Sequence, residues 1–256
     1  MRNAGGHTFN FNFKVEEFLP ERLKLTLSGK DNSNRAIADK SGRLKVDVTG
    51  EYLYGAPASG NRLSTALNIS LWRNPVESLP DFEFGDIKQT SFNQRVVLKD
   101  ISLDKSGKGQ LSYQNNWRNL NSPLKVQFVS SLYESGGRPV SRAHSGIVWP
   151  QETMIGIRKG FGDNNPEPNT RVSFDIVSAS LNGEKRQAKN LDVKLIREDR
   201  RYFWVYSDSR GWHYKWSDNE YIELSSSLDI EEGKSAKLEF PVEWGGYRLE
   251  VSDPIN

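Results

Sequence analysis

Alternation of apolar and polar residues on both sides of one turn constrains the fold of this chain more than any other feature. Residues 44–54 and 63–71 both alternate with a period of two, which places every second side chain on the same face of a β-strand. The turn between them contains Gly55, Pro57 and Gly60, which interrupt a strand. The two segments therefore predict a hairpin around which the first half of the chain is built. Their apolar members are Leu44, Val46, Val48, Tyr52, Tyr54, Leu63, Leu67, Ile69 and Leu71.

The same alternation recurs along most of the chain, whereas no stretch has a helical period. It is clear at residues 23–27, 172–176 and 191–195. Antiparallel sheets explain this pattern, because parallel strands buried on both faces have continuous apolar runs instead. We therefore expect an all-β fold of antiparallel sheets.

A weak internal repeat indicates how the strands are grouped. Residues 66–73 resemble residues 191–197, and residues 107–113 resemble residues 233–240, at similar spacing in both halves. Two copies of one β-sandwich unit explain both similarities. Pro150, between the copies, is the expected domain boundary.

The predicted organisation is two tandem antiparallel β-sandwiches. Residues 16–149 form the first, residues 150–256 form the second, and residues 1–15 are the end strand of a preceding domain or a linker. After its repeated blocks the first copy has two further strand candidates, and the second copy has only one before the sequence ends. We therefore expect the second sandwich to lack its last strand or to borrow a substitute.

Charge and cysteine content exclude several classes of function. The 35 basic residues are interleaved with 33 acidic ones, giving a net charge of +2, so we expect no nucleic-acid partner. The chain has no cysteine, which excludes disulfides, cysteine-ligated zinc and an internal thioester within it. The polar start of the chain has no apolar core of a secretory signal, and it looks like the edge of a piece cut from a longer protein.

Candidate catalytic and metal-binding groups match no known motif. Glu16 and Glu17 are neighbours on an expected strand, so they point to opposite faces. Residues 163–167 offer oxygen ligands for calcium, but their spacing differs from the EF-hand loop. Gly136-Gly137 lacks the lysine and following helix of a phosphate loop. The histidines lie far apart, at His7, His144 and His213. We therefore predict no catalytic residue, no metal site and no cofactor.

An aromatic cluster over residues 202–216 is the one candidate interaction surface. Its rings occur at every second position on each side of the turn at residues 207–211, and each set of three shares one strand face. Exposed rings would form a stacking platform for a sugar or a partner domain. Buried rings would form a cross-strand ladder, and we favour such a ladder or an interdomain contact. The candidate residues are Tyr202, Trp204, Tyr206, Trp212, Tyr214 and Trp216.

Two tracts near the start of the chain resemble a known family. The tract FKVEEFLP at residues 13–20 and the tract YLYGAPASG at residues 52–60 resemble the start of a macroglobulin-type, fibronectin-III-like β-sandwich in the α2-macroglobulin family. Residues 131–140 and 241–251 resemble tracts of the bacterial members. The resemblance extends over essentially the whole chain but covers only a small part of the family's architecture.

The resemblance implies a scaffold fragment of a bacterial broad-spectrum endopeptidase inhibitor, and not an enzyme. In this family a protease cuts a bait region, the molecule changes shape, and a thioester can capture the protease. The bait and the thioester are expected outside this chain. The implied partners are neighbouring domains of the parent chain and, through the full-length protein, proteases. The implied location is the periplasm, with the parent an inner-membrane lipoprotein whose lipid anchor, the only expected membrane contact, lies outside this chain.

Two other functions remain open from the residues alone. A carbohydrate-binding β-sandwich module could use the aromatic hairpin 202–216, for example on cell-wall glycans, and saturable binding abolished by Trp212→Ala would favour it. A β-rich hydrolase with paired carboxylates ranks lowest.

Overall fold

The computed structural model describes residues 11–13, 21–29, 36–38, 42–115, 117, 120–134, 138–162 and 164–254. Within these ranges every regular element is a β-strand, and no helix there could cross a membrane. The strands form four sheets, and nearly every pairing is antiparallel. The all-β fold of antiparallel sandwiches predicted from the alternation is confirmed.

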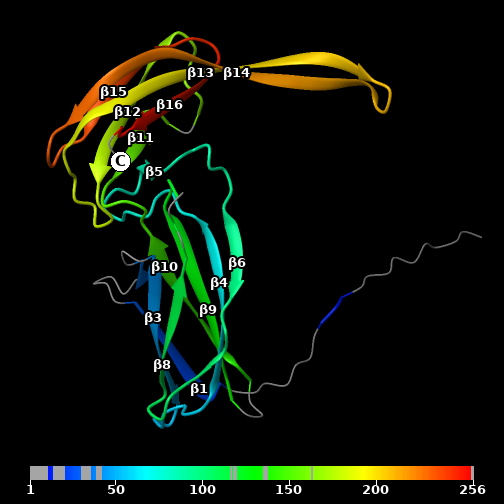
Figure 1. Ribbon diagram of the computed structural model, residues 1–256, viewed down its shortest axis with the longest axis vertical. Coiled ribbons are helices and arrows are strands. Elements are labelled where there is room, and N and C mark those ends of the chain that lie inside the picture. The colour runs from blue at the N-terminus through cyan, green and yellow to red at the C-terminus, as the bar shows by residue number, and fades with distance from the viewer. Residues whose placement is uncertain are drawn as a thin grey trace, which may run out of the picture.

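The first sandwich is built from two sheets that face each other (Figure 1). One sheet has the order β1-β3-β8, and the other has the order β2-β10-β9-β4-β6, with β7 paired to β4. The short β2 pairs parallel to β10, and the other pairs are antiparallel. The strands are β1 (Leu23–Ser28), β2 (Ala36–Ile37), β3 (Arg43–Tyr52), β4 (Arg62–Leu71), β6 (Asn93–Val97), β7 (Ile101–Ser102), β8 (Lys108–Gln114), β9 (Leu124–Tyr133) and β10 (Val140–Val148).

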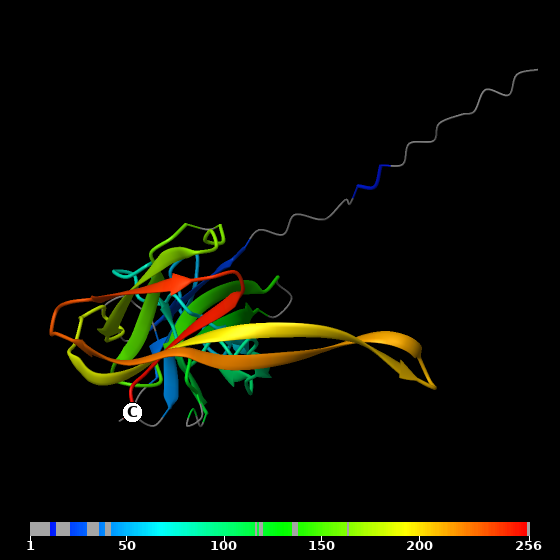
Figure 2. The same cartoon turned by 90° about the horizontal axis from the view of Figure 1, so that it is seen from above.

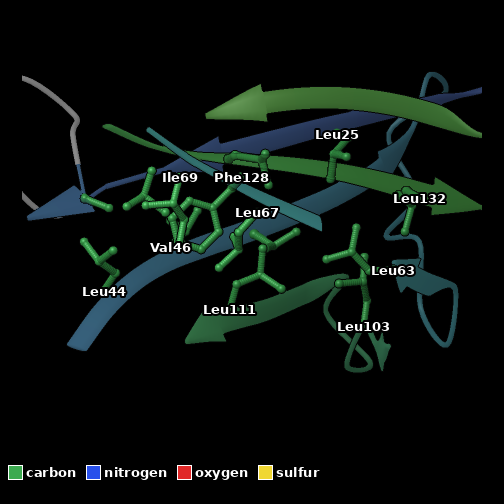
Figure 3. Close-up of a cluster of buried hydrophobic side chains, with 14 of the residues drawn as sticks. Leu25, Leu44, Val46, Leu63, Leu67, Ile69, Leu103, Leu111, Phe128 and Leu132 are labelled. Atoms are coloured by element: carbon green, nitrogen blue, oxygen red, sulfur yellow. The ribbon is translucent and has the colours of Figure 1, made fainter. Parts of the chain in front are cut away.

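Alternate side chains of these strands fill the space between the two sheets (Figure 3). Val46 from one sheet and Leu67 and Phe128 from the other are fully buried. Burial of each such side chain contributes about 1.5–3 kcal/mol to folding. The apolar residues that the alternation singles out therefore contribute to the core of the first sandwich, except Tyr54, whose side chain is exposed.

The prediction that residues 44–54 and 63–71 pair as a hairpin is wrong. β3 pairs with β1 and β8, whereas β4 pairs with β9, β6 and β7, so the two strands belong to opposite sheets. The connection carries the chain across the sandwich, and Ala58 within it is fully buried. Alternation fixes which face of each strand is buried, but it does not choose the strand's hydrogen-bonding partner.

The second sandwich also has two sheets, with the orders β15-β12-β11-β5 and β14-β13-β16. Val172 and Phe240 from the first of these pack against Val193 and Leu195 from the second. The strands are β5 (Glu83–Phe84), β11 (Met154–Lys159), β12 (Thr170–Ala179), β13 (Ala188–Ser207), β14 (Gly211–Ile230), β15 (Ala236–Val242) and β16 (Gly246–Ser252).

The edge strand β5 comes from the first half of the chain and pairs with β11. Its segment, residues 76–84, lies within the range expected for the first sandwich, yet it packs into the second. Phe84 is fully buried there and meets Trp149 edge-on, with ring centroids 5.3 Å apart. Val76, Leu79 and Phe82 join the same cluster as Met154, Val177 and Ala179. A strand from the first half thus lies at an edge of the second sandwich.

The expected strand over residues 1–15 lies mostly outside the described residues. Residues 11–13 belong to no strand, and the side chains of Phe11 and Phe13 are exposed.

Candidate functional site

A long two-stranded ribbon projects from the second sandwich (Figures 1 and 2). β13 and β14 are 20 residues each, and near the body β13 also pairs with β16. That third pairing ends at Glu198, and beyond it the two strands pair only with each other. We call residues 199–219 the aromatic ribbon.

The register places the six candidate rings on one face of the aromatic ribbon. Tyr202 lies opposite Trp216, Trp204 opposite Tyr214, and Tyr206 opposite Trp212. Directly opposed residues of an antiparallel pair share a face. The two sets of three, which sequence spacing assigns to separate strand faces, therefore combine into one double row.

Two of the three opposed ring pairs touch across the strands, and all six rings stay open to solvent. The centroids of Trp204 and Tyr214 are 3.7 Å apart, and those of Tyr206 and Trp212 are 5.6 Å apart. Each of the six side chains is between 56% and 69% exposed. The cluster therefore has the cross-strand contacts of a ladder, but its outer face is uncovered in this chain and the rings are not buried as the favoured interpretation expected.

The opposite face of the aromatic ribbon has a different character. The Arg201 guanidinium donates to a carboxylate oxygen of Asp199 at 2.9 Å, which raises the pKa of Arg201. Lys215 and the more shielded Phe203, 45% exposed, lie opposite each other on this face. Along the double row one face therefore consists of aromatic rings, and the other mixes Phe203 and Val205 with Lys215 and His213.

An ion-pair network holds the root of the aromatic ribbon. Arg248 of β16 has a side chain only 10% exposed and donates to Glu198, to Glu220 at 2.8 Å and to Glu250 at 2.9 Å. These hydrogen bonds, chiefly that to Glu220, raise the pKa of Arg248. The ammonium of Lys88, from the first half of the chain, lies 3.6 Å from Glu220 and 3.3 Å from Glu250. Sequence gives no signal for this network, because its members come from four distant segments.

A small pocket of about 210 Å³ lies beside the same root and is lined in part by Arg197, Tyr221 and Trp244. Arg197 donates to the carbonyl oxygen of Trp244 at 2.9 Å, and its guanidinium lies 5.7 Å from the centre of the Tyr247 ring. The pocket is smaller than the usual volume of a small-molecule site.

The other candidate residues do not come together. His144 lies on β10 and His213 on the aromatic ribbon, in different sandwiches. Asn164, Asn165 and Glu167 lie in an exposed loop. No group of acidic residues and histidines that could hold a metal ion occurs in the part of the chain that the structure describes. The candidates His7, Glu16, Glu17, Gly136, Gly137 and Asp163 lie outside the described residues.

Two family models match successive parts of the chain. The family described as "Bacterial Alpha-2-macroglobulin MG5 domain" matches residues 21–150. The family described as "Bacterial macroglobulin domain 6" matches residues 156–256.

Curated relatives named alpha-2-macroglobulin match nearly the whole chain. Alpha-2-macroglobulin of Escherichia coli (strain K12) is 37% identical over 98% of this chain and 16% of the relative. Alpha-2-macroglobulin of Xylella fastidiosa (strain 9a5c) is 36% identical over 94% of this chain and 15% of the relative. The chain therefore spans about one sixth of the length of these relatives.

Solved structures with a similar fold have related sequences. The native conformation of E. coli alpha-2-macroglobulin matches with a TM-score of 0.75 and 38% identity, over 94% of this chain and 16% of that one. Salmonella alpha-2-macroglobulin reacted with methylamine matches with a TM-score of 0.77 and 38% identity, over the same shares. Another E. coli structure is described as activated by porcine elastase; it matches with a TM-score of 0.74 and 39% identity, over 93% of this chain and 21% of that one.

Proposed function

Because this chain belongs to the bacterial α2-macroglobulin family, as its resemblance predicted, we propose that it is a rigid scaffold unit of a broad-spectrum endopeptidase inhibitor. The observation that carries the proposal is the match of consecutive macroglobulin domains over residues 21–150 and 156–256. The chain spans 16% of its E. coli relative, so the activity of a whole parent protein is part of the proposal. The division at Pro150 and the residue ranges of the two sandwiches remain part of it as well.

The junction between the sandwiches supports a rigid unit. Residues 76–84 cross from one sandwich into the core of the other. Arg73 holds the segment after residue 84 in place. Its guanidinium donates to the carbonyl oxygens of Asp86 at 2.9 Å and Gln89 at 3.1 Å. A connecting segment that is buried in the core of the second sandwich resists relative movement far better than a flexible linker does. Such a unit would move as one body when the parent changes shape.

Protease trapping would belong to the whole parent. This chain has no cysteine, so a thioester would have to come from another part of the parent. The elastase-activated E. coli structure supports proteases as partners of the family. A periplasmic location, a lipid anchor outside this chain, and the absence of a catalytic role here complete the proposal.

Protease assays with large and small substrates test this function. The full-length parent should protect a protein substrate from an endopeptidase while leaving cleavage of a short chromogenic peptide unchanged, because a trapped protease keeps its active site. The 256-residue chain alone should inhibit neither reaction. Inhibition by this chain alone, or a parent that blocks the short peptide equally, would contradict the proposal.

A carbohydrate-binding module is the less favoured function, because the matches of both halves are to macroglobulin domains. Glycan binding is therefore treated below as an outcome of an experiment.

A further inference from the structure

We propose that the aromatic face of the ribbon, residues 199–219, is a docking surface for another domain of the same parent polypeptide. The inference rests on the proposed scaffold function and names the surface through which this unit holds a neighbour. The fitting partner is a flat protein face with apolar side chains and a few oxygen acceptors for the tyrosine hydroxyls and the tryptophan N–H groups.

The exposed area matches a specific interface. Six rings that are each 56–69% exposed present on the order of 700 Å² of mostly aromatic surface. Soluble monomers rarely expose an apolar patch this large unless it binds something. A standard protein–protein interface buries about 800 Å² per partner and is enriched in tyrosine and tryptophan.

The ribbon is a poor free-standing element. From Asp199 to Ser207 it extends about 30 Å without a third strand, and isolated two-stranded hairpins are only marginally stable in water. Solvation on all sides would favour polar residues on both faces. Over residues 202–216 no charge interrupts the three opposed aromatic pairs, whereas the other face pairs Phe203 with Lys215 and Val205 with His213. The charged positions 200 and 218 follow the row on the aromatic face, toward the body. The difference between the faces indicates that another protein surface covers the aromatic face in the parent.

The aromatic face continues a face that is already in contact with another part of the protein. By strand alternation, Glu198 and Glu220 share the face of Tyr202 and Trp216. At the root this face meets Lys88 of the first half through Glu220 and Glu250. The aromatic surface therefore lies farther out on the same face as this contact, separated from it by the charged positions 200 and 218.

Three observations favour a domain of the same polypeptide over other occupants. The chain spans only 16% of its E. coli relative, so most of such a parent lies outside it. A covalently linked domain has an effective concentration in the millimolar range, which keeps a modest interface closed. A sugar site needs polar side chains that fix the hydroxyl groups, and within the double row from Tyr202 to Trp216 every position on this face is aromatic.

Photocrosslinking in the full-length parent tests the inference. Benzoylphenylalanine replaces Tyr214 on the aromatic face or, as the matched control, the neighbouring Lys215 on the opposite face. On irradiation of the unreacted parent, position 214 should crosslink several-fold more strongly than position 215. The crosslinks should join peptides of the same polypeptide outside residues 1–256, as read by mass spectrometry.

Hydrogen exchange gives an independent readout without any substitution. The amides of residues 199–219 should exchange at least several-fold more slowly in the parent than in the 256-residue chain alone. In the parent, Trp204→Ser with Tyr214→Ser should remove this protection, and Phe203→Ser on the other face should retain it.

The outcomes separate the possible occupants. Crosslinks between two copies of the parent would overturn the inference in favour of self-association. Protection that develops only after adding chitooligosaccharides or muropeptides would overturn it in favour of a glycan. Equal exchange in both proteins without crosslinks would also overturn it. The exchange experiment contains no protease, so it is independent of inhibition. Protection of residues 199–219 in a parent that fails to inhibit proteases would support the inference and contradict the proposed function. Inhibition by a parent without this protection would support the proposed function and contradict the inference.

Discussion

Arg248 shows how one side chain fixes the direction of a long element. Its guanidinium reaches carboxylates on β13, β14 and β16, and Lys88 adds a contact from the first half. The acceptors are partly exposed, so solvent screens each pair, but the arrangement is a network and not an isolated surface pair. Its geometric effect is to tie the last three-stranded part of the sheet together where the ribbon leaves the body.

The network makes stability depend on acid pH. The hydrogen bond from Arg248 lowers the pKa of Glu220 below its ordinary value of 4.5. A lowered carboxyl pKa stabilises the fold above the unfolded-state value, and this stabilisation is lost as the pH falls through the lowered pKa. We expect Glu220→Gln to lower the urea unfolding midpoint at pH 7 and to have little effect near pH 3. The exposed Glu152→Gln is the control, and an effect of Glu220→Gln that is equal at both pH values would contradict this account.

At the scale of elements, β5 is held by a fit between a ring and a glycine. Gly156 of β11 lies directly opposite Phe84, and a Cβ at Gly156 would lie 2.6 Å from the Phe84 ring. The absence of a side chain at Gly156 is therefore what allows β5 to place the ring of Phe84 in the core of the second sandwich.

This fit predicts the cost of one methyl group. Gly156→Ala should destabilise the fold by about 1–3 kcal/mol, because overpacking moves the buried ring or β5 itself. Gly162→Ala is the matched control, since a Cβ at Gly162 would meet no other atom within 4 Å and the change should be nearly neutral. Denaturant titrations measure both variants, and equal midpoints for the two would show that β5 does not depend on the glycine.

At the scale of the whole molecule, the two sandwiches are joined by shared packing and not only by the chain at residue 150. Phe84 packs against Trp149 in a cluster with Met154, Val177 and Ala179. Farther along the same segment, Lys88 contacts the root of the ribbon. The segment from residue 76 to residue 88 therefore couples the first sandwich to both the core and the projecting ribbon of the second.

Coupled folding follows from this shared core. The chain should unfold in one calorimetric transition, and Phe84→Ala should cost about 3–5 kcal/mol, because it empties a fully buried site in the second sandwich that a segment of the first half fills. Val97→Ala on the exposed edge strand is the control, since the side chain is 68% exposed. Two separate transitions in the unaltered chain would show that the sandwiches fold independently.

The candidate site could be predicted in part from sequence. Spacing identifies the six rings from Tyr202 to Trp216 and predicts a hairpin, because residue period and turn composition are local properties. Their placement on a single face follows from the register, and their exposure follows from the projection of the ribbon beyond the sheet that packs against β13 near the body (Figures 1 and 2). The Arg248 network could not be predicted, because its partners are distant in sequence.

Sequence alone determined the all-β character, the buried faces of the strands that form the cores and the family of the chain, because alternation and local motifs are written residue by residue. The tertiary structure decided which strands pair: β3 and β4 lie in opposite sheets, and β5 crosses into the second sandwich. Any strand with one apolar face can join several neighbours, and only the simultaneous burial of all these faces selects among them.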